Sequence, residues 1–148
     1  MKKINLSHLD LEMYYDKINN LEVYVVPNNK GEGNYAVLTT KYGSIDNKFI
    51  LDGKEIITPQ GVAHFLEHKM FESENGTDPF NFYAEKGADA NASTSYFKTS
   101  YLFSGSDNFE ENLKFLLEYK QTIFYRWKYW KRARNYWRRN KNGKRWSI

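Results

Sequence analysis

The feature that most constrains this chain is the segregation of its charges. Residues 124–148 hold ten of the 22 Lys and Arg residues and none of the 18 Asp and Glu residues. Residues 1–123 therefore keep 12 basic against 18 acidic side chains, a net charge of −6, although the whole chain carries +4. The same tail contains all four tryptophans. We therefore divide the chain into a mildly acidic body of one domain, residues 1–123, and a basic aromatic tail, residues 124–148.

The composition of the body is that of a protein that buries a core. The chain is 41% hydrophobic and 18% aromatic, which excludes generic disorder for most of it. It contains no cysteine, so disulfide frameworks, Cys-type zinc sites and thiol catalysis are excluded. Polar residues interrupt the start of the chain where a secretory signal needs an apolar segment. No stretch approaches the roughly 18 apolar residues of a membrane span. We expect a cytoplasmic protein.

Strand-like and helix-like segments alternate in a way that predicts an α+β fold, a mostly antiparallel sheet packed with helices. The residues Asn19 and Asn20 are expected to form a hairpin turn. Helices are expected to start at Thr58-Pro59, at Asp78-Pro79 and at Asp107. The expected strands are 13–18, 21–26, 35–42, 89–93 and 96–104, the expected first helix is 59–71, and 43–53 is expected to be a polar connection. The aromatic residues expected to pack in the core are Tyr96, Phe97, Tyr101 and Phe103.

The chemistry is concentrated in the pattern H-x-x-E-H at His64-Phe65-Leu66-Glu67-His68. Positions i and i+4 lie one above the other on a helix, so His64 and His68 can present their imidazoles to one metal ion. Glu67 lies beside that pair, and its carboxylate can take a proton from water that the metal acidifies to a pKa of about 7. The alternative is a surface helix on which two histidines fall at this spacing by chance.

The residues around this pattern resemble a known family. The segments GVAHFLEHKMFE (61–72) and GADANASTSYFKTSYLFS (87–104) are similar to the pitrilysin/insulinase family of zinc metallopeptidases, most closely its bacterial processing-peptidase-like members. The resemblance covers about residues 10–123 and implies that the body, residues 1–123, is an incomplete N-terminal metallopeptidase domain. It implies that His64 and His68 bind Zn²⁺ and that Glu67 is the general base. It also implies that Ala90, Asn91 and Ala92 belong to an edge strand to which a substrate peptide adds as a further strand.

The third zinc ligand of the family has no counterpart in this sequence. A catalytic zinc takes three protein ligands, and the resemblance places the third, a glutamate, near residue 139, where this chain has Arg139. Arg132 stands where a second acidic residue is expected. We therefore expect weakened zinc binding and an inactive chain. The alternative is a working endopeptidase whose third ligand is Glu72, Glu74 or a residue of a second peptidase subunit.

The tail itself is open to two interpretations. One possible choice of codons for residues 123–127, ATA TTT TAC AGA TGG, translates as Pro-Tyr-Phe-Thr-Asp-Gly when CC is placed in front, and this is how the family continues. We therefore interpret the tail as aberrant, an out-of-frame translation of a lost helix, and expect Leu66, Phe103 and Leu117 to be exposed without it. The alternative is a functional basic aromatic segment that binds nucleic acid or an anionic surface. We favour the first interpretation and do not expect a nucleic-acid partner.

Overall fold

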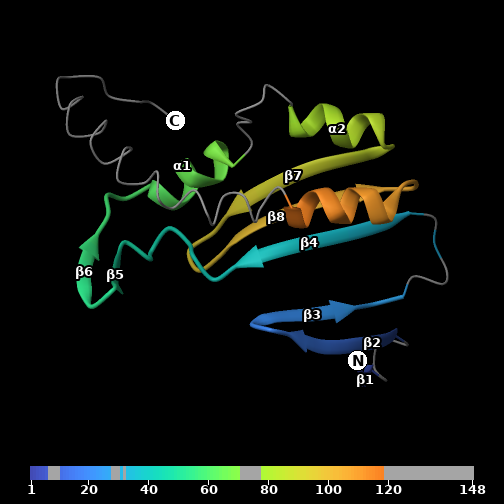
Figure 1. Cartoon of the computed structure of the whole chain (residues 1–148), viewed down its shortest axis with the longest axis horizontal. Helices are drawn as coiled ribbons and strands as arrows, with labels where there is room; N and C mark the ends of the chain where they lie inside the picture. The colour runs from blue at the N-terminus through green and yellow to red at the C-terminus, as the bar shows by residue number, and fades with distance from the viewer. Residues whose placement is uncertain (7–10, 28–30, 32, 71–77, 119–148) are drawn as a thin grey trace. The chain divides into compact units, whose positions relative to one another are not determined.

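The computed structural model describes residues 1–6, 11–27, 31, 33–70 and 78–118, and the tail lies outside them. The chain divides into two compact units, Met1–Asn34 and Tyr35–Ile148, which are described separately below (Figure 1). Antiparallel sheets and helices are both present, so the predicted α+β class is confirmed. No helix among the described residues is long and apolar enough to cross a membrane.

The first unit is a three-stranded antiparallel sheet in the order β1-β2-β3. Its strands are β1 (Lys2–Leu6), β2 (Leu11–Ile18) and β3 (Leu21–Val25). The predicted turn is confirmed, because Ile18 pairs with Leu21 across Asn19 and Asn20, and Asn19 has a φ of 55°. Asparagine tolerates the left-handed conformation that a two-residue hairpin turn requires. The sequence did not predict β1.

The second unit contains the sheet that positions the candidate site. Its order is β4-β8-β7, formed by β4 (Asn34–Thr40), β8 (Thr99–Gly105) and β7 (Ala88–Thr94) (Figure 1). Strands β7 and β8 are antiparallel neighbours joined by the turn 95–98, with Thr94 opposite Thr99. Strand β7 therefore has a sheet neighbour on one side only, among the residues described.

In the part of the chain that the structure describes, three helical segments accompany this sheet. They are α1 (Val62–Lys69), α2 (Pro79–Glu85) and a helix at residues 109–118. The predicted start of α2 is confirmed, because the Asp78 side chain accepts a hydrogen bond from the Phe80 N–H at 2.9 Å and Pro79 occupies the first helical position. Gly87, with a φ of 71°, follows the helix as expected. The third helix starts one residue later than predicted. Its first backbone hydrogen bond runs from the Asn112 N–H to the Asn108 carbonyl and not to that of Asp107.

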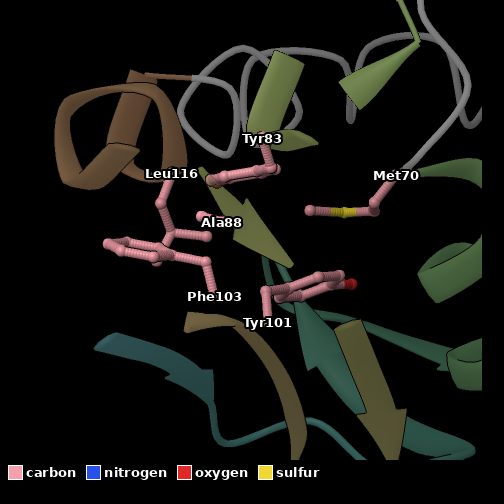
Figure 2. Close-up of a cluster of buried hydrophobic side chains, with 6 residues drawn as sticks. All are labelled: Met70, Tyr83, Ala88, Tyr101, Phe103 and Leu116. Atoms are coloured by element: carbon pink, nitrogen blue, oxygen red, sulfur yellow. The ribbon is translucent and has the colours of Figure 1, made fainter. Parts of the chain in front are cut away.

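The core of this unit lies between β7, β8 and the helical segments. Phe103 has no exposed surface, and its ring stacks on Tyr83 of α2 with a centroid separation of 5.6 Å. Figure 2 shows the buried cluster, whose members are Met70, Tyr83, Ala88, Tyr101, Phe103 and Leu116. The expected exposure of Phe103 is therefore wrong, because Leu116 and Tyr83 cover it, whereas Leu66 and Leu117 are half-buried.

The predicted start of the first helix differs in the structure. Helix α1 begins at Val62 and not near Pro59, because Gly61 has a left-handed φ of 84° that a helix interior excludes. Thr58 does not cap the helix; its N–H donates to the Asn47 carbonyl at 2.8 Å. Residue 71, the predicted end of the helix, lies outside the described residues.

The predicted strand 96–104 begins later, at Thr99, and its first two aromatics are not in the core. Tyr96 and Phe97 lie in the turn before β8 and are each 70% exposed. A hairpin turn needs residues at its tip whatever their hydropathy, and strand propensity does not mark which residues those are. The prediction for Tyr101 and Phe103 is confirmed.

The segment 43–53, expected to be a polar connection, contains a strand. Strand β5 (Lys48–Leu51) pairs with β6 (Lys54–Ile57) in a two-stranded hairpin. The turn residues Asp52 and Gly53 both have positive φ, 51° and 71°. Asp-Gly between two short strands is a strong hairpin signal, so the sequence did contain the information.

Candidate metal centre

Helix α1 brings the two histidines of the H-x-x-E-H pattern together. The Nε2 atoms of His64 and His68 lie 3.0 Å apart, and the ring centroids are separated by 4.7 Å. The helix presents both imidazoles on one side because residues four apart are neighbours on its surface. His64 is half-buried and His68 is exposed, so the pair opens to solvent.

Glu67 completes the group of donor atoms. Its carboxylate and the two imidazole nitrogens all lie within 4.8 Å of one another. The sheet fixes this carboxylate, since Glu67 Oε2 accepts a hydrogen bond of 2.6 Å from the Thr94 hydroxyl at the end of β7. One carboxylate oxygen is therefore held by the sheet.

Thr94 belongs to a short line of hydroxyl groups that runs across the β7–β8 hairpin. Its Oγ1 lies 3.3 Å from Thr99 Oγ1, and the Thr99 hydroxyl donates to the Tyr42 carbonyl at 2.9 Å. Thr99 is only 2% exposed. Burial, and secondly the nearby charge of Glu67, raise the pKa of Tyr101 on the same strand, so this phenol stays neutral at physiological pH.

The turn 95–98 that joins the two threonines is packed against Gly43. The Ser44 N–H donates to the Ser95 carbonyl at 2.9 Å. A Cβ on Gly43 would lie 2.3 Å from the Tyr96 carbonyl oxygen and 2.6 Å from the Lys98 nitrogen. Only glycine allows this approach, because both obstructing atoms are backbone.

Gly43→Ala should therefore destabilise the chain by about 3 kcal/mol, the upper end of the cost of overpacking. Denaturation by urea measures the change in the free energy of unfolding. Gly53→Ala is the control, because Gly53 has a positive φ but no atom within 4 Å of the added Cβ. It should cost only about 1 kcal/mol for the left-handed backbone. Equal losses of stability in the two variants would show that Gly43 is not packed closely against the turn 95–98.

The donor set fits a zinc ion. Zinc–nitrogen bonds of about 2.0–2.1 Å in tetrahedral geometry place two ligand nitrogens about 3.3 Å apart. The observed separation of 3.0 Å between the Nε2 atoms is close to that value. The donors are two imidazoles and a carboxylate, which zinc accepts.

The candidate substrate-binding residues lie on the strand that supports Glu67. Ala90, Asn91 and Ala92 are in β7 and pair with Phe103, Leu102 and Tyr101 of β8. Asn91 is exposed, and its Oδ1 accepts a hydrogen bond from the Ala92 N–H at 2.8 Å. The structure thus places these residues on a strand at the edge of the β4-β8-β7 sheet, a few residues before Thr94.

Four residues considered as the third ligand or its replacement lie outside the described residues: Glu72, Glu74, Arg132 and Arg139. Sequence reasoning missed the contact of Thr94 with Glu67 and the hydrogen bond from Thr99 to the Tyr42 carbonyl. Both threonines are in the segment 87–104, but a threonine in a strand carries no sign that its hydroxyl meets a side chain 27 positions earlier.

The fold and this site define a class, a domain of the metallopeptidase type with an inverted H-x-x-E-H helix over an antiparallel sheet. Residues 54–140 match the family described as Insulinase (Peptidase family M16). The chain belongs to that family, and the resemblance found in the sequence is confirmed.

Individual relatives agree with this assignment. The chain is 45% identical over 128 residues to the uncharacterized zinc protease YmfH of Bacillus subtilis, covering 84% of this chain and 30% of that protein. It is 32% identical over 78 residues to AlbF of Bacillus subtilis, also named as a zinc protease, covering 52% and 18%. A crystal structure of an M16-like peptidase from Alicyclobacillus acidocaldarius aligns with a TM-score of 0.70 and 37% identity, covering 74% of this chain and 26% of that one. The chain spans less than a third of the length of each.

Proposed function

We propose that this chain carries the zinc-binding and general-base part of an M16-type metalloendopeptidase site. His64 and His68 hold the zinc and Glu67 serves as the base. The observation that supports this most directly is the 3.0 Å approach of the two Nε2 atoms with the Glu67 carboxylate beside them. The zinc proteases to which the chain is similar support the choice of metal.

The proposed roles follow from the positions of the side chains. When bound, zinc supplies Lewis-acid activation of water and of the scissile carbonyl. Glu67 accepts the proton of the attacking water and later gives it to the leaving amine. Thr94 holds one oxygen of Glu67 and leaves the other available for this transfer. A substrate peptide binds along the edge of β7, where the backbone of Asn91 and Ala92 pairs with it.

We further propose that the chain alone hydrolyses peptides at a negligible rate. Two imidazoles leave a catalytic zinc one protein ligand short, and Glu67 cannot act as that ligand and as the base at once. Arg139 stands where the family resemblance places the missing glutamate. A second peptidase subunit in the cytoplasm is the partner that we propose to complete the site.

Zinc binding and hydrolysis test the two parts of this proposal separately. The purified chain should bind one zinc per molecule, measured by competition with a chromogenic chelator. It should cleave a quenched fluorescent peptide no faster than Glu67→Gln, which keeps both imidazoles but lacks the base. A chain that binds no zinc would contradict the proposed site. Cleavage well above the Glu67→Gln level would contradict the proposed inactivity.

A further inference from the structure

We propose that Thr94 is a positioning residue that keeps the Glu67 carboxylate out of the coordination shell of the zinc. This inference rests on the proposed zinc site and adds a residue to it. A carboxylate one position before a histidine ligand has two possible uses: it can bind the metal itself or stay free to move a proton. The hydrogen bond from β7 decides between them.

The distances show why a restraint is needed. All three donor groups already lie within 4.8 Å of one another, while the ligands of a tetrahedral zinc are about 3.3 Å apart. The side chain of Glu67 has rotatable bonds, so its carboxylate can move toward the two imidazoles. A carboxylate near a divalent cation is strongly attracted to it. Among the described residues, the hydrogen bond to the Glu67 carboxylate comes from β7 and not from α1.

The acceptors of the two threonine hydroxyls indicate that Thr94 is the residue that restrains the Glu67 carboxylate. A carboxylate and a carbonyl oxygen only accept, so Thr94 donates its one proton to Glu67 and Thr99 donates its one proton to Tyr42. The 3.3 Å contact between the two threonine oxygens then contains no proton. Thr94 is thus the donor to Glu67, and Thr99 is tied to the loop at Tyr42 instead. A charge-assisted hydrogen bond of 2.6 Å is of the stronger kind.

Zinc affinity of the full chain, by chelator competition, tests the inference. Thr94→Val removes the donor, so Glu67 is free to join the two imidazoles as a third protein ligand, and zinc should bind more tightly than to the wild type. Thr94→Ser keeps the hydroxyl and should bind as the wild type does. In a Glu67→Gln background, Thr94→Val should have no effect. General damage to the fold would weaken zinc binding, so an increase separates positioning from a merely structural role.

Thr99→Val is the matched control. It removes a buried threonine hydroxyl from the same hairpin but keeps the hydrogen bond from Thr94 to Glu67. Its zinc affinity should equal that of the wild type. Unchanged or weaker zinc binding by Thr94→Val would overturn the inference, as would an equal increase in the Glu67→Gln background. A wild-type chain that binds no zinc would instead overturn the proposed function.

The stability of the zinc-free chain tests the Thr94–Glu67 hydrogen bond without the metal. Thr94→Val and Glu67→Ala should each lower the urea midpoint of unfolding, because each breaks the same hydrogen bond. The double variant should lie no lower than the less stable single variant. Additive midpoints would show that the two side chains act independently and would overturn the contact on which the inference depends.

Discussion

His68→Ala should lower the affinity of the chain for zinc by more than about 100-fold, the upper end of the cost of losing an outer-shell partner. The remaining imidazole of His64 cannot hold the ion in place, because the 3.0 Å pairing of the two Nε2 atoms is the core of the donor set. Competition with a chromogenic chelator gives the dissociation constant. His64→Ala should have an effect of the same size, since the two nitrogens are equivalent in the pairing.

His8→Ala is the control for this experiment. It removes the third histidine of the chain, which is outside the described residues, and should leave zinc affinity unchanged. Circular dichroism should show that all three variants stay folded, because neither His64 nor His68 belongs to the buried cluster. Equal zinc affinity in the wild type and in His68→Ala would contradict a zinc site on α1.

Phe103→Ala should lower the free energy of unfolding by about 3–5 kcal/mol. The side chain has no exposed surface and packs against Tyr83 and Phe109, with ring centroids 5.6 Å and 5.7 Å away. Truncation leaves a cavity between β8 and two helices that rigid neighbours cannot refill. Urea denaturation, followed by circular dichroism, measures the change in the free energy of unfolding.

Phe97→Ala is the matched control, because the same side chain is removed from a position that is 70% exposed. It should change stability by no more than about 0.5 kcal/mol. A loss of similar size in both variants would mean that the Phe103 side chain is not in the core. The pair also tests the corrected placement of the two aromatics, which the sequence had predicted to pack alike.

Much of the local structure could be predicted from the sequence because it depends on nearby residues. Asn19-Asn20 turns the first hairpin, and Asp78-Pro79 starts α2, because turn and cap chemistry act over a few positions. The hairpin at Asp52-Gly53 was equally visible but was missed. The start of α1 was misplaced because Thr58 and Pro59 form a good local start signal. The long-range bond of Thr58 to Asn47 and the left-handed Gly61 prevent its use.

The sequence by itself determined the chemistry of the site: two imidazoles and a carboxylate at i, i+3 and i+4 share a helix face whatever surrounds them. Only the tertiary structure decided what each donor is free to do. Thr94 reaches Glu67 from 27 residues away, and it does so because the β7–β8 hairpin packs against α1. Likewise Phe97 and Phe103 are the same residue type in one stretch, yet one lies in a turn and the other under two helices. Contacts between distant segments depend on how the elements pack, and no periodicity along a single chain records that.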